Sequence, residues 1–247
     1  MTSAYVSEVF SSIQGEGIHA GRPAVFVRFC GCNLACSYCD TGYARDDAEA
    51  LVVHANGASG EAGRRQVPNP VSGGDLVDLV KECCPVPDVV VLTGGEPLLH
   101  AGFLRDALPG LRRSGYGLHL ETNGTLAEAF ASVKDLLDFV CMDLKLPSTQ
   151  AGVDLMARHR DFLAALEGMR AAVKVVITPE AGDDEIDYAS RVVAGANGHL
   201  PVLLQPAFAG SRPTVGAERL LRAHALARRR LADVRISIQM HKVLGAR

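Results

Sequence analysis

Apolar runs of strand length alternate with helix-like segments between residues 88 and 239. The strand-like runs are 88–93, 117–122, 138–145, 172–178, 201–205 and 234–239, and the helical patterns are 101–114, 125–137, 152–170, 183–196 and 215–232. The run D-V-V-V-L-T at 88–93 has the continuous apolar character of a parallel strand that is buried on both faces. Strands that alternate with helices in this way predict β-α-β units and an α/β fold with a parallel sheet.

The rest of the chain fits one large domain. A strand is expected at 23–29 and a helix at 74–84, whereas the polar, Gly- and Ala-rich segment 42–71 is expected to form a long loop or insertion. The chain has 247 residues, and α/β barrels of about 200–250 residues often form a single unit. We therefore expect residues 1–247 to form a single domain.

Polar side chains follow the predicted strands at the point where each strand ends. These residues are Thr93–Glu96, Glu121–Gly124, Asp143–Lys145, Thr178, Gln205 and Gln239–Lys242. The carboxyl ends of parallel strands meet at one edge of a sheet, where ligands bind. Ordinary turns would favour Gly, Asn, Asp and Ser over the Glu, Lys, Gln and His found here. The pattern therefore predicts one shared cavity.

Three cysteines lie on a short loop after the strand at 23–29. Cys32, Cys36 and Cys39 have the spacing C-x3-C-x2-C, and the loop itself supplies no fourth cysteine. A structural zinc site normally has four ligands, and an iron–sulfur cube usually takes four cysteines. Three ligands therefore predict a cube with one iron free to bind another molecule. A zinc knuckle completed by His19 or Asp40 stays open as an alternative, as do three small buried residues without a metal.

Composition and charge exclude several functional classes. The net charge of −3 gives no general reason to bind nucleic acid or a membrane surface. The first residues lack the basic and apolar regions of a signal peptide, and no apolar run approaches the roughly 20 residues that cross a bilayer. We expect a cytoplasmic protein whose seven cysteines are ligands or free thiols.

The cysteine spacing together with T-G-G-E-P at 93–97 resembles the radical S-adenosylmethionine (radical SAM) superfamily. The resemblance implies a partial TIM barrel of the (β/α)6 type, open on one side around a [4Fe-4S] cluster. It also implies that SAM chelates the free iron and that one electron cleaves SAM to a 5′-deoxyadenosyl radical. In such enzymes the cofactor supplies the difficult chemistry, and the protein supplies placement and shielding.

A longer set of motifs points to one family within this superfamily. S-S-I-Q-G-E-G at 11–17, C-D-T at 39–41, E-T-N-G, K-V-V-I, a Leu-Gln-Pro strand end and Q-M-H-K near the C-terminus occur in order. Over nearly the whole chain this set resembles the 7-carboxy-7-deazaguanine synthases (QueE). The resemblance implies a lyase that converts 6-carboxy-5,6,7,8-tetrahydropterin to 7-carboxy-7-deazaguanine with loss of ammonia, on the route to queuosine. It further implies SAM that is not consumed, a Mg2+ ion, a flavodoxin- or ferredoxin-type electron donor and a homodimer.

The resemblance also assigns residues. For the pterin these are Ile13, Gln14, Gly15, Glu16, Arg28, Thr93, His241 and the terminal Arg247; for SAM they are Gly95, Glu96, Asp143, Leu144, Lys145, Gln205, Pro206, Ala207 and Phe208; Cys32, Cys36 and Cys39 hold the cluster, and Thr41 holds Mg2+. The planar fork of Arg28 suits the substrate carboxylate. His241 is expected to bind substrate or to act as a general acid or base.

For several of these residues a purely structural role stays open. Arg28 could form a surface salt bridge, His241 could be a buried structural histidine, and Thr41 could be a turn residue. Two other functions are also weighed. A radical SAM activase would share the three cysteines and the G-G-E segment but would not need Q-G-E-G or His241. A non-catalytic zinc module would need no shared cavity.

Overall fold

The computed structural model describes residues 2–54, 63–84, 86 and 88–246, and a ten-stranded sheet forms its centre. In sheet order the strands are β14 (Val234–Ile236), β11 (Val202–Pro206), β10 (Ala171–Ile177), β9 (Phe139–Leu144), β8 (Gly117–Thr122), β7 (Val89–Gly94), β3 (Pro23–Phe29), β2 (Val6–Ile13), β4 (Ala50–His54) and β5 (Arg64–Pro68). From β3 to β14, each strand runs parallel to the next. Among the described residues β14 and β5 do not pair, so the barrel stays open. The predicted parallel, incomplete barrel is confirmed.

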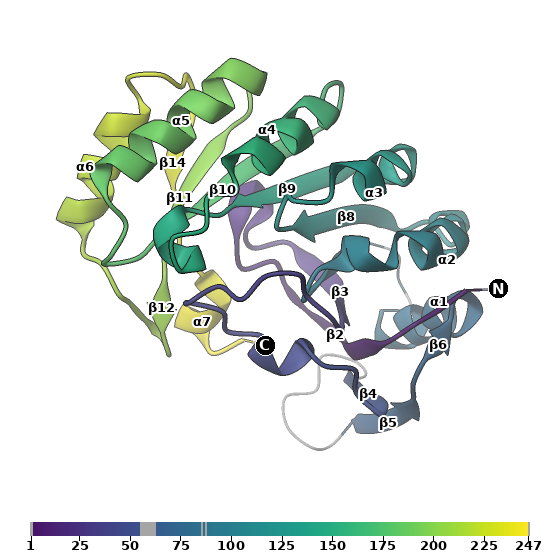
Figure 1. The fold of residues 1–247 in the computed structure, drawn as a ribbon. Helices are drawn as coiled ribbons and strands as arrows, with labels where there is room; N and C mark the ends of the chain where they lie inside the picture. Colours follow the sequence, from purple (N-terminus) through teal and green to yellow (C-terminus); the bar gives the residue numbers. More distant parts are fainter. Residues whose placement is uncertain (1, 55–62, 85, 87, 247) are drawn as a thin grey trace.

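The helices cover the outer face of the curved sheet. They are α1 (Gly73–Cys83), α2 (Ala101–Arg113), α3 (Ala127–Ala131), α4 (Met156–Ala165), α5 (Asp183–Asn197), α6 (Ala217–Ala227) and α7 (Met240–Leu244). Figure 1 shows α1–α6 in an arc outside the strands, with α7 apart from them. No helix in the described part of the chain is long and apolar enough to cross a membrane.

The side-chain alternation of each parallel strand separates core from cavity. On β10, Val173, Val175 and Ile177 belong to the main apolar core, which reaches from Ala4 to Val234 in the sequence. The intervening residues of a strand point to the opposite face, which places Lys174 on the inner face of the barrel. Burial of each core valine or leucine contributes about 1.5–3 kcal/mol, so the outer faces of the strands hold the helices in place.

The segment 42–71, expected to be a long loop, carries two strands in the structure. β4 pairs parallel with β2, and β5 pairs antiparallel with β4. Leu51 and Val53 are fully buried in the main core, and this burial stabilises β4 on the open edge of β2. The prediction of a loop was wrong for 50–54 and 64–68, because the polar composition of the segment hid a short alternating strand. The central part of the segment, 55–62, lies outside the described residues.

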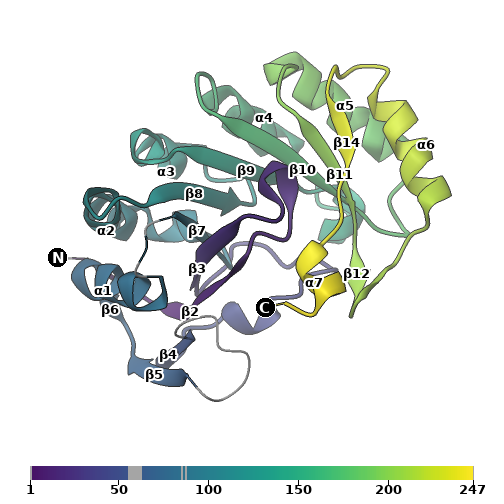
Figure 2. The ribbon, with the colours of Figure 1, turned by 180° about the vertical axis from the view of Figure 1, so that it is seen from behind.

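The β2–β3 hairpin folds its tip onto the inner face of the sheet. The tip contains a 3-10 turn, η1 (Gly17–His19), and the His19 ring lies 4.7 Å from the ring of His119 on β8 and 4.4 Å from that of Phe139 on β9. Figure 2 shows the hairpin crossing in front of β9 and β10. This crossing carries residues 14–16 into the barrel interior.

Candidate active site

One cavity of about 220 Å³ lies inside the partial barrel. The predicted site residues that line it are Ile13, Gln14, Gly15, Glu16, Arg28, Cys32, Cys36, Cys39, Thr41, Thr93, Gly95, Asp143, Lys145, Gln205, Pro206, Ala207, Phe208 and His241. Glu96 and Leu144 are buried outside its lining, and Arg247 lies outside the described residues. Thr178 is also buried away from the cavity. The other strand ends meet as expected.

The cysteine loop follows β3 and forms one wall of the cavity. Cys39 N–H donates to Cys36 O at 3.2 Å, and Ser37 N–H donates to Thr149 O at 3.1 Å, which ties the loop to the segment after β9. All three thiols are free, and Cys39 is exposed. These contacts hold three unpaired thiols at the edge of one cavity.

The donor set fits an iron–sulfur cluster better than a single zinc ion. Within the described residues, no three His, Cys, Asp or Glu side chains come together as a site for one metal ion. A cluster instead takes one thiolate at each of several irons, so its ligands need not converge on a point. His19 packs against the rings of His119 and Phe139 on the inner face of the sheet, and Asp40 pairs with Lys242 Nζ at 2.6 Å. Neither residue completes a zinc site with the cysteines.

The glycines after β7 bring two backbone segments together. Gly95 N–H donates to Phe29 O at 3.0 Å, and Glu96 N–H donates to Gly31 O at 2.7 Å. A Cβ on Gly95 would lie 1.9 Å from Gly31 O. The lack of a side chain at Gly95 therefore allows the end of β7 to pack against the base of the cysteine loop.

Glu96 points into the protein rather than into the cavity. Its Oε1 accepts hydrogen bonds from Leu98 N–H at 3.0 Å and Thr122 Oγ1 at 2.8 Å, and its Oε2 accepts one from Asn123 N–H at 2.8 Å. Burial raises the pKa of this carboxyl, while those hydrogen bonds oppose the shift. Glu96 therefore fastens the ends of β7 and β8 to each other.

Gln14 and Thr93 share one carboxylate across the barrel. Gln14 Nε2 donates to Glu121 Oε1 at 2.9 Å, and Thr93 Oγ1 donates to Glu121 Oε2 at 2.8 Å. Gln14 Oε1 accepts from Glu16 N–H at 3.0 Å. Both ends of the Gln14 amide are thus fixed, and Glu121 at the end of β8 orients Gln14 and Thr93 toward the cavity.

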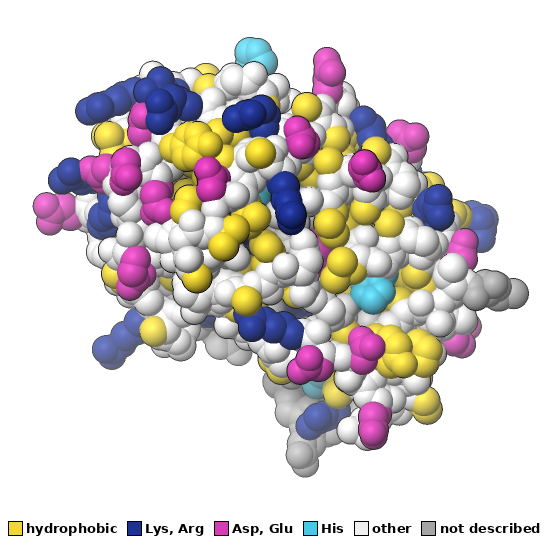
Figure 3. All heavy atoms as spheres, viewed as in Figure 1, with side chains coloured by type: hydrophobic (Ala, Val, Ile, Leu, Met, Phe, Trp, Pro, Cys, Tyr) yellow, Lys and Arg dark blue, Asp and Glu magenta, His cyan; other side chains and the backbone are white. Residues whose placement is uncertain are grey.

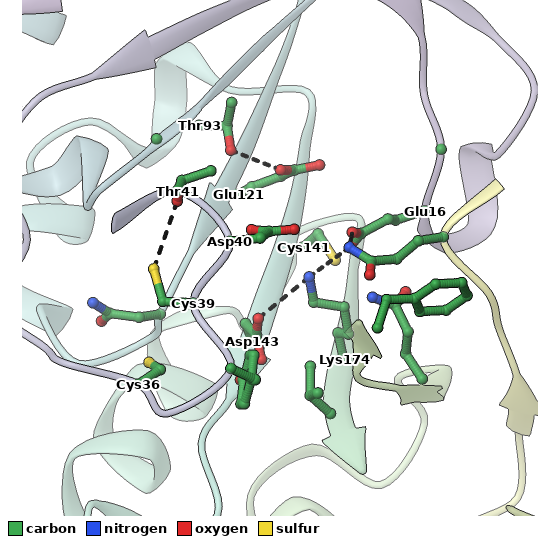
Figure 4. Close-up of a pocket in the computed structure, with 18 of the residues that line it drawn as sticks. Glu16, Cys36, Cys39, Asp40, Thr41, Thr93, Glu121, Cys141, Asp143 and Lys174 are labelled. Carbon is green, nitrogen blue, oxygen red and sulfur yellow. Dashed lines mark hydrogen bonds and ion pairs between the residues drawn. The ribbon is translucent and has the colours of Figure 1, made fainter. Parts of the chain in front are cut away.

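Charged side chains form a continuous chain through the cavity, part of which Figure 4 shows. Lys174 Nζ lies 2.6 Å from Glu16 Oε2 and 3.2 Å from Asp143 Oδ2, and Lys145 Nζ lies 2.8 Å from the same Asp143 oxygen. Burial would raise the pKa of Glu16, but the charge and hydrogen bond of Lys174, helped by Gln239, lower it to about 2. Burial opposes the charge of Lys174, yet Asp143 and Glu16 outweigh it and raise the lysine's pKa.

The C-terminal segment closes the cavity between the hairpin tip and the cysteine loop, whose Asp40 pairs with Lys242. Met240 N–H donates to Gly15 O at 2.8 Å, and Gln239 Nε2 donates to Glu16 Oε1 at 2.7 Å. His241, on α7, lines the cavity next to Gly15. Burial lowers the pKa of its imidazole, while the charge of Glu16 opposes the shift. The ring is therefore neutral near pH 7 and can accept a proton.

Arg28 lies on the cavity wall, in a partly buried ion pair. Its Nε is 3.8 Å from Glu8 Oε1, and its side chain is 16% exposed. The guanidinium lies 5.7 Å from the ring centre of Phe10, which stacks on Phe26 at 5.1 Å. The alternative of a surface salt bridge does not describe this position, because the arginine and both rings line the cavity. The two phenylalanines also give the cavity an aromatic wall.

Comparison with known proteins identifies the family. The model of the radical SAM superfamily matches residues 26–183. The 7-carboxy-7-deazaguanine synthase of Geobacter sulfurreducens is 41% identical over 98% of this chain and 97% of its own length. The enzyme of the same name from Methanopyrus kandleri is 36% identical over 97% of this chain and 92% of its own length.

The chain belongs to the 7-carboxy-7-deazaguanine synthase family. The crystal structure of QueE from Escherichia coli has the same fold, with a TM-score of 0.64 at 22% identity over 97% of this chain and 95% of that one. Membership of the radical SAM superfamily brings a [4Fe-4S] cluster and SAM as cofactors, and Cys32, Cys36 and Cys39 are the residues that would hold the cluster.

Two residues that line the cavity, Cys141 and Lys174, were missed from the sequence. Glu121 and Gln239 also line it; they were predicted as strand-end residues of the shared cavity but were given no ligand. A signal existed for Lys174, because it is the one charged residue of the otherwise apolar run A-V-K-V-V-I. A lysine there must either face the barrel interior or be buried in the apolar core, and the second costs far more free energy. Cys141 gave no such signal, since buried cysteines are common in cores.

Proposed function

We propose that the chain converts 6-carboxy-5,6,7,8-tetrahydropterin to 7-carboxy-7-deazaguanine and ammonia. The observation that carries the proposal is the meeting of Gly15 and Met240, 225 positions apart in the sequence, through a 2.8 Å hydrogen bond. That bond joins the Q-G-E-G segment to the Q-M-H-K segment on one wall of the cavity. A general radical SAM activase has no need for this wall.

The pterin occupies the side of the cavity formed by the hairpin tip and α7. Arg28 binds the substrate carboxylate, since its mostly buried guanidinium lines the cavity and can form two parallel hydrogen bonds. Glu16, ionised at neutral pH, accepts N–H donors of the aminopyrimidinone ring, and Gln14 and Thr93 line the same face. The backbone of Ile13 and Gly15 completes the wall. Arg247 is proposed to contact the substrate from the C-terminus.

His241 serves the proton transfers of the reaction. Loss of ammonia requires a proton on the leaving nitrogen, and aromatisation of the new ring requires removal of a proton from carbon. A neutral, half-buried imidazole in the cavity can accept and return one proton. The cluster and SAM, when bound, supply the radical that starts the rearrangement.

SAM occupies the opposite side, between the end of β7 and the ends of β9 and β11. The proposed contacts are with Gly95, Glu96, Asp143, Leu144, Lys145, Gln205, Pro206, Ala207 and Phe208. Because Glu96 and Leu144 are buried, a backbone contact or a positioning role is proposed for them rather than a side-chain contact. Thr41 is proposed to hold Mg2+ through its hydroxyl, since Mg2+ often takes few protein ligands together with substrate and water.

Further properties are proposed with the reaction. The protein works in the cytoplasm as a single-domain subunit of a homodimer, receives electrons from a flavodoxin- or ferredoxin-type donor, and binds neither nucleic acid nor membrane. Figure 3 shows acidic and basic side chains interspersed on the face that it displays, which supports the last point for that face. The product feeds queuosine or related deazapurines.

The test is anaerobic reconstitution with iron and sulfide, followed by incubation with SAM, dithionite, Mg2+ and 6-carboxytetrahydropterin. The product is identified by mass and by comparison with authentic 7-carboxy-7-deazaguanine. The proposal expects that compound with no net consumption of SAM. Cleavage of SAM without a pterin product would contradict the substrate assignment and favour the activase.

A further inference from the structure

Lys174 lies between two carboxylates that the proposed function assigns to different ligands. Its ammonium is 2.6 Å from Glu16 Oε2, on the pterin side, and 3.2 Å from Asp143 Oδ2, on the SAM side. Figure 4 shows the lysine extended between these two side chains in the middle of the cavity. No other described lysine or arginine forms an ion pair with a carboxylate on each of these two sides.

The sheet fixes this bridging position. Lys174 on β10 pairs in register with Asp143 on β9, so the two side chains lie next to each other on the inner face. The lysine side chain is 14% exposed, and those of Glu16 and Asp143 are each 15% exposed. In such a poorly solvated place, the ammonium that bridges the two carboxylates cannot be replaced by water at little cost.

One atom of this group lacks a partner. Asp143 Oδ1 is buried and accepts no hydrogen bond, whereas Oδ2 receives both Lys145 and Lys174. A buried carboxylate oxygen without a donor is costly. The oxygen therefore suits a hydrogen-bond donor brought by a ligand on the SAM side of the cavity.

We propose that Lys174 couples the binding of the pterin to the binding of SAM. A hydrogen-bond donor from SAM that reaches Asp143 Oδ1 offsets part of the negative charge of that carboxylate. The ammonium of Lys174, already closer to Glu16 than to Asp143, is then attracted less by Asp143, and it holds Glu16 more firmly in the position that accepts the pterin N–H groups. Each ligand thereby strengthens the binding of the other, and thermodynamic linkage requires the factor to be the same in both directions. The inference rests on the proposed function, because it needs Glu16 and Asp143 to serve different ligands.

The experiment measures four dissociation constants by calorimetry on the anaerobically reconstituted protein without a reductant, so that no turnover occurs. SAM is titrated with and without 6-carboxytetrahydropterin, and the pterin is titrated with and without SAM. In the wild type we expect each ligand to tighten the other by about fivefold or more. Lys174→Met should bring this ratio close to one, and Lys174→Arg, whose fork can reach both carboxylates, should restore part of it.

Lys81→Met is the matched control, because Lys81 is exposed on α1, away from the cavity. It should leave all four constants unchanged. Asp143→Asn provides a second variant that keeps Lys174 and Glu16 in place. It removes the charge that competes with Glu16 for Lys174, so it should tighten pterin binding in the absence of SAM and abolish any further strengthening by SAM. This variant tests the proposal if Lys174→Met does not unfold cooperatively.

Two outcomes would overturn the coupling alone. One is a wild-type ratio of one in a protein that converts the pterin. The other is a Lys174→Met or Asp143→Asn variant that binds both ligands more weakly but keeps the wild-type ratio, which would make Lys174 a purely structural residue. A wild type that binds SAM but neither binds nor converts the pterin would instead contradict the proposed function.

Discussion

Gly15 and His241 pack so closely that a side chain on the glycine has no room. A Cβ built on Gly15 would lie 1.9 Å from His241 Nδ1 and 2.6 Å from its Cγ. The neighbouring hydrogen bond from Met240 N–H to Gly15 O, at 2.8 Å, fixes the two backbones. The imidazole therefore takes its place in the cavity from a residue near the opposite end of the chain.

Gly15→Ala should displace His241 while the fold persists. Because a misplacement of about 1 Å at a reacting centre can cost about 100-fold in rate, we expect kcat/KM to fall by about that factor. Steady-state kinetics measures the loss, and the melting temperature checks the fold. Gly195→Ala is the control, because a Cβ at that helical glycine meets nothing within 4 Å. An active Gly15→Ala variant would remove His241 from the mechanism.

Gly95→Ala should impair assembly of the cluster, and not only the binding of SAM. The added Cβ would lie 1.9 Å from Gly31 O at the base of the cysteine loop, so the loop must shift. We expect the reconstituted variant to hold less iron and sulfide than the wild type and to show weaker absorption from the cluster. Gly102→Ala on α2, where a Cβ meets nothing within 4 Å, should load normally. Full loading of Gly95→Ala would show that the loop tolerates the shift.

Arg28→Met should weaken binding of the carboxylated substrate. A hydrogen bond to a charged group contributes about 1.5–3 kcal/mol, so KM should rise about 10- to 100-fold while kcat changes less. The KM of Arg28→Lys should lie between those of the wild type and Arg28→Met, because lysine keeps the charge but cannot form the two parallel hydrogen bonds. Arg22→Met, which removes a more exposed ion pair with Asp88, is the control. An unchanged KM in Arg28→Met would place the carboxylate elsewhere.

Thr41→Ala should remove the dependence of the rate on Mg2+. Thr41 lines the cavity, and its Oγ1 lies 3.8 Å from Cys39 Sγ. Without that hydroxyl oxygen we expect little response of the rate to added Mg2+, and we expect Thr41→Ser to keep the wild-type response. The measurement is activity against Mg2+ concentration at fixed SAM and pterin. A Thr41→Ala variant with the full wild-type response would exclude this residue as the ligand.

Glu16 should make the folded protein sensitive to acid. Its pKa in the fold is about 2 against an ordinary value of 4.5, so its ionised form stabilises the fold above pH 4.5. That contribution, on the order of 2–3 kcal/mol, is lost as the pH falls from 4.5 toward 2. Glu16→Gln should show a flatter dependence of unfolding free energy on pH in that window, measured by denaturant titration of the cluster-free protein. Parallel curves for variant and wild type would contradict the shifted pKa.

The sequence by itself determined the chemistry and the order of the elements. The spacing of Cys32, Cys36 and Cys39 needs no fold to be recognised, because three ligands on one loop are close in space wherever the loop lies. The strand ends could be assigned to one edge because parallel strands must align their carboxyl ends. Local patterning was misleading where composition hid a short strand, as for Leu51 and Val53.

Only the tertiary structure decided which side chains meet across the cavity. Residues 14–16 enter the barrel because the hairpin tip folds back onto the sheet, and no local pattern encodes that path. Glu96 turns inward because its carboxylate accepts hydrogen bonds from Leu98 N–H in the following turn and from Asn123 N–H after β8. Lys174 meets both Glu16 and Asp143 because the strand register and the hairpin bring three distant segments together. Such contacts depend on how the strands and the hairpin pack, which local sequence patterns do not specify.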